Sequence, residues 1–127
     1  MIRLRVLVAF EDNYRVYGEV IVSAIRSTRS HLDVAAVAGI RDLEAEVARF
    51  DPHLVISSSR QPPLLSGQHS RLSWVELSVD PNRPSLICID GHRWESFNPS
   101  LQELLDVVDE TELVLVGASR QTGEGAC

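Results

Sequence analysis

Lysine is absent from this chain, and all twelve of its basic residues are arginine. These arginines are scattered along the sequence rather than clustered, and the net charge is −6. A protein that binds nucleic acid needs a basic stripe to neutralise the phosphates, and no such stripe is present. We therefore do not expect nucleic acid to be a partner of this protein.

Long hydrophobic runs are also missing. The longest apolar run extends from Val6 to Phe10, which is the length of a strand and far below the roughly 20 residues that cross a bilayer. The segment from Met1 to Arg5 leads directly into this run and leaves no room for a signal peptide. The sequence therefore predicts no membrane partner.

Cysteine is scarce as well, with two residues in the whole chain. Cys88 lies in an apolar run and Cys127 is the last residue, so we expect no structural disulfide between them. Reduced cysteines and the lack of a signal peptide favour a cytoplasmic location. At 127 residues, the chain fits one domain that buries a continuous core without disulfides or metals.

Strands and helices alternate in the first half of the chain. Residues 5–10, 34–38 and 54–56 are near-continuous apolar runs, which are typical of strands covered on both faces. Apolar residues recur at helical spacing up to residue 29, and again between 43 and 50. The expected apolar positions of the first helix are Val16, Val20 and Ala24, together with Tyr17, Ile21 and Ile25. Two successive βα units predict a parallel sheet with helices on its faces.

The second half of the chain changes character. Residues 74–79 and 85–89 both have the composition of strands, and only the five residues from Asp80 to Pro84 connect them. A parallel crossover needs about a dozen residues, so these two strands are predicted to be antiparallel neighbours or to leave the sheet. The Asp90–Gly91 pair then predicts a tight turn with a return strand at 92–97.

A final helix is predicted after Asn98–Pro99, which would supply the cap and the first-turn proline. Its expected buried stripe consists of Leu101, Leu104, Leu105 and Val108. Residues 113–116 fit either an extension of this helix or a short further strand. Residues 57–71 are predicted to be mostly loop, and residues 117–127 are predicted to be a flexible tail.

Three stretches of the chain resemble the receiver domains of bacterial two-component response regulators. Val6 to Asn13 is similar to the receiver strand that ends in an acidic pair. Asp51 to Ser58 is similar to the receivers' "P-D-L-V-L-L-D" strand, and residues 98–110 have the position of their last helix. The likeness covers residues 4–60 and the last helix, and it fails between them.

The resemblance implies positions for a phosphorylation site. In receivers the acidic pair binds Mg²⁺, and an aspartate at the end of the third strand accepts a phosphoryl group from a histidine kinase. A hydroxyl residue ends the fourth strand, and a lysine ends the fifth. In this chain Glu11 and Asp12 match the acidic pair, Ser58 stands at the acceptor position, and Ser78 matches the hydroxyl residue. The lysine has no counterpart.

These departures predict a degenerate phospho-acceptor pocket that does not transfer phosphate. A serine hydroxyl is not ionised at neutral pH and needs a general base before it can attack phosphorus. Replacing one of three carboxylates removes a charged ligand that Mg²⁺ prefers. No lysine can stabilise the charge on the phosphoryl oxygens, and the fork of an arginine does not readily replace an ammonium. We therefore expect no enzyme activity, no cofactor and no resident metal.

Other polar residues have simpler interpretations. Glu11 and Asp12 are expected to cap the first helix and complement its dipole, in preference to holding a metal. The serines at 57–59 lack the sequence context of a nucleophile elbow, so a polar strand end is expected there. The histidines are expected to be solvent-facing or structural because they lack ligand spacing. They are His31, His53, His69 and His92.

Three large aromatic residues lie in the segment that departs from the receiver pattern, namely Trp74, Trp94 and Phe97. They either fill the core or form a candidate partner surface, since tryptophan is enriched in interface hot spots. Receivers use the face around their fourth helix and fifth strand as output. A rebuilt sheet in this region would therefore alter the choice of partner.

Taken together, the sequence predicts a flavodoxin-like (receiver-like) three-layer α/β sandwich over residues 1–116, with a parallel sheet and a C-terminal half modified by a hairpin or meander. We expect a phosphorylation-independent, response-regulator-like signalling or regulatory domain that binds a signalling protein or a second copy of itself. The alternative is a degenerate receiver fold that binds a small ligand in the former acidic pocket. An enzyme of unrecognised chemistry ranks lowest, because no nucleophile–base pair is visible.

Overall fold

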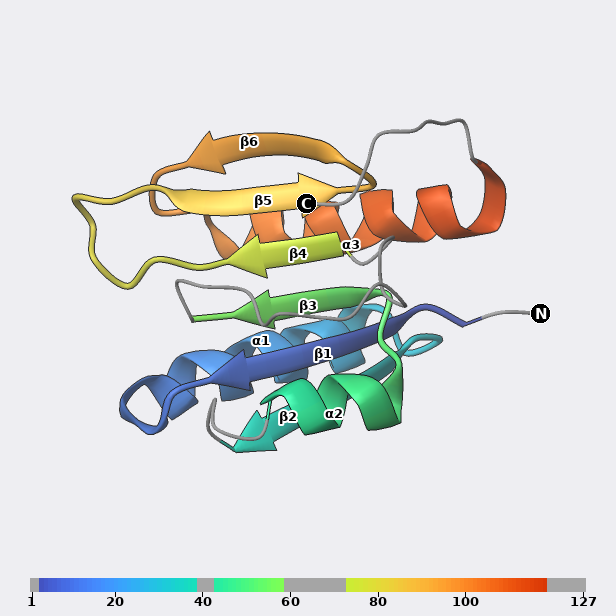
Figure 1. The fold of residues 1–127 in the computed structure, drawn as a ribbon, viewed down its shortest axis with the longest axis horizontal. Helices are drawn as coiled ribbons and strands as arrows, with labels where there is room; N and C mark the ends of the chain where they lie inside the picture. Colours follow the sequence, from blue (N-terminus) through green and yellow to red (C-terminus); the bar gives the residue numbers. More distant parts are fainter. Residues whose placement is uncertain (1–2, 39–42, 59–72, 119–127) are drawn as a thin grey trace.

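The computed structural model describes residues 3–38, 43–58 and 73–118 (Figure 1). The elements follow in the order β1 (Arg5–Phe10), the 3-10 turn η1 (Asp12–Tyr14), α1 (Arg15–Thr28), β2 (Asp33–Ala38), α2 (Leu43–Phe50), β3 (Leu54–Ser57), β4 (Ser73–Glu76), β5 (Ser85–Ile89), β6 (His92–Ser96), α3 (Leu101–Leu113) and the π-helical turn η3 (Val114–Ala118).

The described strands form one sheet in the order β2-β1-β3-β4-β5-β6. β2, β1, β3 and β4 run parallel to one another, whereas β5 is antiparallel to β4 and β6 is antiparallel to β5. The fold class is therefore α/β with a mostly parallel sheet. The prediction of an antiparallel unit in the second half is confirmed by the pairing of β4 with β5 and of β5 with β6, and the link between β4 and β5 contains no helix.

Helices cover both faces of the sheet, an arrangement compatible with the three-layer fold expected from the sequence. α1 and α3 pack on one face, where the larger core cluster joins them to β1, β3, β4 and β5. α2 packs on the opposite face with Leu43 and Val47, against Leu7, Ala9 and Val55. The central strands β1 and β3 are buried on both faces, which explains their near-continuous apolar sequences.

The apolar positions expected on α1 divide between the core and the surface. Ile21 and Ile25 are buried, whereas Val16, Tyr17 and Val20 are exposed. The reason lies at Gly18, where a Cβ would come within 3.3 Å of the Phe10 ring. The helix approaches β1 most closely at this glycine, which turns the positions on its far side toward solvent.

The caps of both long helices also differ from the prediction. The turn η1 precedes α1, and neither Glu11 nor Tyr14 makes a side-chain capping hydrogen bond. At α3, the Oγ of Ser100 accepts a hydrogen bond from the backbone N–H of Glu103 at 3.1 Å. Asn98 has a positive φ of 48°, whereas a cap residue takes the extended backbone conformation that Ser100 has.

The hairpin turn is confirmed, with Asp90 and Gly91 both at positive φ and Ile89 paired with His92. The open question at residues 113–116 is settled in favour of a helical extension, because η3 continues α3. Residues 119–127 of the expected tail, and all but the first two residues of the expected loop at 57–71, lie outside the described residues.

Cys88, on β5, is disulfide-bonded in the structure, so the expectation that it forms no disulfide is wrong. Its side chain lies on the α2 side of the sheet, because Cys88 is paired with Trp74 of the α2 cluster. On that side α2 packs over β1, three strands away from β5. Cys127 lies outside the described residues. The inference of a cytoplasmic location from reduced cysteines therefore loses its basis.

Within the described ranges, none of the helices combines the length and the apolar character that crossing a bilayer requires.

Candidate functional site

The carboxyl ends of β1, β3 and β4 meet at one edge of the sheet because these strands are parallel (Figure 1). The chain order reverses around β1, since β2 lies on one side of it and β3 on the other. In open α/β sheets, ligands bind outside the carboxyl ends of the strands at such a reversal. Glu11 and Asp12 follow β1, and Ser58 follows β3, so the fold places the acidic pair and the acceptor position at this point.

Glu11 and Ser58 are in direct contact. The backbone N–H of Glu11 donates to the Oγ of Ser58 at 3.1 Å, and the N–H of Ser58 donates to the carbonyl of Ala9 at 3.2 Å. These bonds join the ends of β1 and β3. Among the described residues, no carboxylate or imidazole accepts a hydrogen bond from the Ser58 hydroxyl. Within the described residues, the Ser58 Oγ therefore links the end of β3 to the backbone that follows β1.

Ser78 is held by the turn that connects β4 with β5. Its N–H donates to the Oγ of Ser85 at 2.8 Å. Its own Oγ donates to the carbonyl of Asp80 at 3.0 Å and accepts from the N–H of Asp80 at 3.2 Å. Because β4 ends at Glu76, Ser78 lies two residues beyond the strand. The hydrogen bonds within the described part of the chain do not connect Ser78 to Glu11, Asp12 or Ser58.

Two roles were considered for the acidic pair, a metal site and a helix cap. In the described part of the chain, no group of three or more histidine, cysteine, aspartate or glutamate residues could hold a metal ion. Glu11 makes no side-chain cap, as stated above, and Asp12 lies in the first turn of η1, where its charge favours the helical dipole. Both side chains are exposed.

The three aromatic candidates separate into core and surface. Trp74 is only 7% exposed and belongs to the α2 core cluster, so it cannot contribute to a partner surface. Its buried indole N–H has no hydrogen-bond partner among the residues that the structure describes. Trp94 and Phe97 are exposed, at 37% and 61%. Trp94 lies on the α1/α3 side of the sheet, because it is paired with Ile87 of the larger core cluster.

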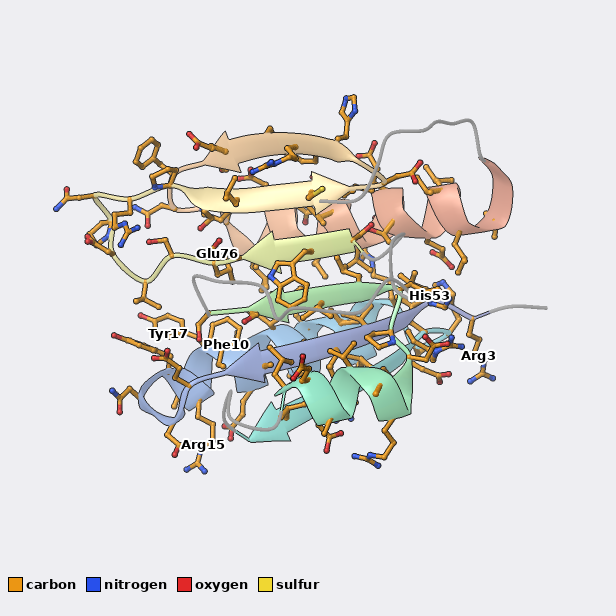
Figure 2. The ribbon with its side chains drawn as sticks, in the orientation of Figure 1. Arg3, Phe10, Arg15, Tyr17, His53 and Glu76 are labelled. Atoms are coloured by element: carbon orange, nitrogen blue, oxygen red, sulfur yellow. The ribbon has the colours of Figure 1, made fainter. Side chains whose placement is uncertain are left out.

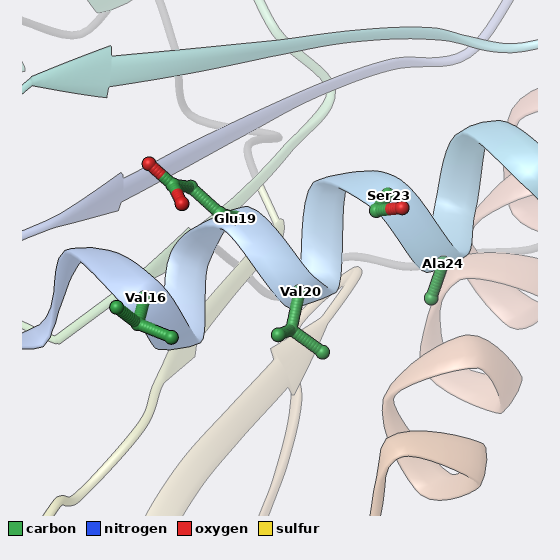
Figure 3. Close-up of a pocket in the computed structure, with 5 residues that line it drawn as sticks. All are labelled: Val16, Glu19, Val20, Ser23 and Ala24. Carbon is green, nitrogen blue, oxygen red and sulfur yellow. The ribbon is translucent and has the colours of Figure 1, made fainter.

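A surface that the sequence interpretation did not identify lies on α1. Val16, Tyr17 and Val20 are 70%, 62% and 51% exposed, and we call them the α1 apolar surface. They adjoin a surface hollow of about 380 Å³ that Val16, Glu19, Val20, Ser23 and Ala24 line (Figure 3). The signal for this surface was present in the sequence, since α1 carries more apolar residues than one buried stripe requires.

The α1 apolar surface begins near the edge that holds the acidic pair. Tyr17 and Phe10 lie at the same end of the molecule, opposite His53 (Figure 2). The Tyr17 ring contacts the ring of Tyr14 in a tilted arrangement, with centroids 6.3 Å apart. Tyr14 in turn packs against the larger core cluster, so Tyr17 is supported at one side by the core.

His53 is structural, as expected. It lies before β3, and its Nδ1 accepts a hydrogen bond from the backbone N–H of Arg5 at 2.9 Å. Burial, and next the positive charge of Arg5, lower the pKa of His53, so the neutral acceptor form is favoured. This end of the sheet is remote from the acidic pair, and its histidine serves the fold.

Searches against protein-family models, curated proteins and solved structures each found no match for this chain.

Proposed function

We propose that this protein is a phosphorylation-independent signalling or regulatory domain with a flavodoxin-like, receiver-like fold, and that it acts by binding a protein partner. The strand order β2-β1-β3-β4-β5 is the order of flavodoxin-like folds and supports this assignment. The chain departs from that pattern at β5, which is antiparallel, and at the added strand β6.

The α1 apolar surface is the observation that supports a protein partner. Tyrosine is enriched among interface hot spots. Valine is not, but burying its apolar side chain in a contact is favourable. Full burial of a valine-sized side chain contributes roughly 1.5–3 kcal/mol, so three such groups supply several kcal/mol to an interface. Trp94 and Phe97 are also exposed, but Trp94 lies on β6, four strands from β1, and is a separate apolar position.

The acidic edge offers little for phosphotransfer. The Ser58 hydroxyl accepts a hydrogen bond from the backbone of Glu11, and the chain has no lysine. We therefore propose that the activity of the domain does not depend on phosphorylation.

A second candidate function, the binding of a small ligand at this edge, is favoured by one observation. The exposed carboxylates of Glu11 and Asp12 lie where the strand order reverses, which is the usual ligand position in α/β sheets. The experiment below separates the two candidates.

The partner is sought by placing a photo-crosslinking phenylalanine analogue at Tyr17 of the full chain in its native host. The captured protein is then purified and titrated against variants by calorimetry. Val20→Glu puts a carboxylate into the α1 apolar surface and is expected to weaken binding at least tenfold. Ala45→Glu makes the same change on exposed α2, across the sheet, and serves as the matched control with unchanged affinity.

Asp12→Ala is expected to bind the partner as the wild type does. If Asp12→Ala abolishes binding while Val20→Glu retains it, the adaptor proposal fails and the ligand pocket takes its place. Circular dichroism must show that each variant is folded before its affinity is compared.

A further inference from the structure

The two edges of the sheet differ in how they are protected. An edge strand presents unpaired backbone groups to other strands, and proteins usually guard it with charged residues or proline. β6 has this protection, since His92, Arg93 and Glu95 are exposed along it. β2 lacks it, because after Asp33 the strand contains only valine and alanine up to residue 38.

Within the described residues, no strand pairs with the outer side of β2, and the alternation of the strand defines which backbone groups point there. The N–H of Asp33 donates to the carbonyl of Leu4 on β1, which sets the alternation of the strand. The backbone groups of Val34 and Ala36 therefore point away from β1, to the open side. The Val34 carbonyl accepts a hydrogen bond from the Arg26 guanidinium of α1 at 3.2 Å, and the side chain of Ala36 is exposed.

The side of α1 next to this edge is polar. A second hollow of about 490 Å³ lies there, between α1 and β2. Its lining residues are Glu19, Val22, Ser23, Arg26 and Ser27 of α1 and Ala36 of β2. Glu19 and Ser23 also line the first hollow, together with Val16 and Val20 (Figure 3). This polar flank therefore adjoins the α1 apolar surface.

We propose that a second copy of the chain pairs antiparallel with β2 about a two-fold axis near Ala36, which extends the sheet across the dimer. This inference goes beyond the proposed function and centres on the edge of β2, which adjoins the α1 apolar surface. Residues that face each other across such an axis must lie on the same side of the sheet, a condition that the pair Ala36–Ala36 meets. Small alanine side chains at the centre allow the two strands to approach to hydrogen-bonding distance.

The position of α1 agrees with this axis. α1 contacts both β1 and β2, so its axis lies above the gap between them. Neighbouring strands are about 4.8 Å apart, which places each α1 roughly one strand spacing from the two-fold axis. The two α1 helices would then lie about 10 Å apart, which is close to the distance at which helices pack.

The same two-fold rotation brings opposite charges of the two polar flanks together. Arg26 lies beside Val34, and Ser23 lines the hollow together with Ala36, so an axis through Ala36 also passes near Ser23. Glu19 precedes Ser23 and Arg26 follows it, so antiparallel helices place Glu19 of each copy opposite Arg26 of the other. The small Ser23 at the crossing allows close packing. This match favours a second copy over an unrelated extended peptide.

The test measures the oligomeric state of the full chain by sedimentation over a range of concentrations. The wild type is expected to be a dimer, and non-reducing electrophoresis must show that no intermolecular disulfide holds it together. Ala36→Lys introduces the charge that protects natural edges and is expected to give a monomer. Ala45→Lys on α2 is the matched control and is expected to remain a dimer.

A charge exchange tests the proposed contact itself. Glu19→Arg and Arg26→Glu are each expected to weaken the dimer about tenfold, since each opposes like charges. The double variant is expected to recover most of the wild-type affinity, which a general loss of structure would not allow. A monomeric wild type, a dimeric Ala36→Lys variant or a double variant without recovery would each overturn the proposal.

Discussion

The two halves of the sheet follow different rules of connection. From β1 to β4, helices or long segments join parallel strands, and the central strands are buried on both faces. From β4 to β6, short links join antiparallel strands, and β6 is exposed along most of its length. A buried parallel strand forms because its apolar run packs on both faces, whereas the pairing of an exposed hairpin strand is set by the turn that precedes it. The first half of the molecule thus depends on its core, and the second half depends on local chain geometry.

The largest expected difference is in the free energy of unfolding, between a substitution on a buried strand of the first half and one on the edge strand of the second. Ile56 on β3 is fully buried, so Ile56→Ala should lower the free energy of unfolding by about 2–5 kcal/mol. Trp94→Ala on β6 removes a side chain that is already 37% exposed and should cost clearly less. Urea unfolding measures both. Equal costs would show that β6 belongs to the core as fully as β3 does.

Two glycines, one in each half, should respond to substitution for different reasons. Gly18→Leu forces a side chain against the closely packed Phe10 ring and should cost about 1–3 kcal/mol of stability through overpacking. Gly91 has a φ of 86°, so Gly91→Ala should cost roughly 1–2 kcal/mol through backbone strain. Phe10→Ala discriminates between the two causes. In a double-mutant cycle it should reduce the stability cost of Gly18→Leu and leave the cost of Gly91→Ala unchanged.

The ion pair between Arg29 and Asp109 joins the end of α1 to α3 and so connects the two halves. The guanidinium donates from Nε and NH2 to both carboxylate oxygens at 2.8 and 2.6 Å, and these hydrogen bonds lower the pKa of Asp109. Because the folded-state pKa is depressed, the stabilisation is present above the unfolded value of 3.8 and is lost as the pH falls through the folded value.

Asp109→Asn should therefore reduce stability at about pH 7 and have little effect at about pH 2. Asp109 is 45% exposed, so solvent screening limits the expected loss to about 0.5–1 kcal/mol. Glu110→Gln removes an exposed neighbouring charge and is the control for net charge. A loss that persists unchanged in acid would mean that Asp109 contributes by packing and not by its charge.

The smallest expected effect is at the acidic edge, where no change should occur. Incubation with acetyl phosphate and Mg²⁺ should leave the intact mass of the protein unmodified, because a serine replaces the acceptor carboxylate and lysine is absent. A stable phosphoryl adduct on Ser58 would show that the edge retains chemistry, and the phosphorylation-independent function would be wrong.

Some features of the candidate site could be predicted from the sequence. The meeting of Glu11 and Ser58 follows from two parallel apolar strands that end in polar residues, since such ends share one edge of the sheet. The position of Ser78 could not be predicted in this way. The strand that precedes it ends at Glu76, and the turn to β5 captures the serine through Asp80 and Ser85. The end of a strand depends on the partner with which it pairs, which the local sequence does not specify.

Features that depend on only a few neighbouring residues could be predicted from the sequence. The five-residue link between β4 and β5 is too short for a crossover, and Asp90–Gly91 suits the positive φ of a tight turn. Only the tertiary structure decided which side of α1 is buried, because the helix has apolar residues on both sides. Because Gly18 packs closely against Phe10, Val16 and Val20 lie at the surface. Trp74 is buried in the same way, because it packs in a cluster with α2, an element distant in the sequence. Burial depends on where remote elements pack, whereas turns and link lengths act within a few residues.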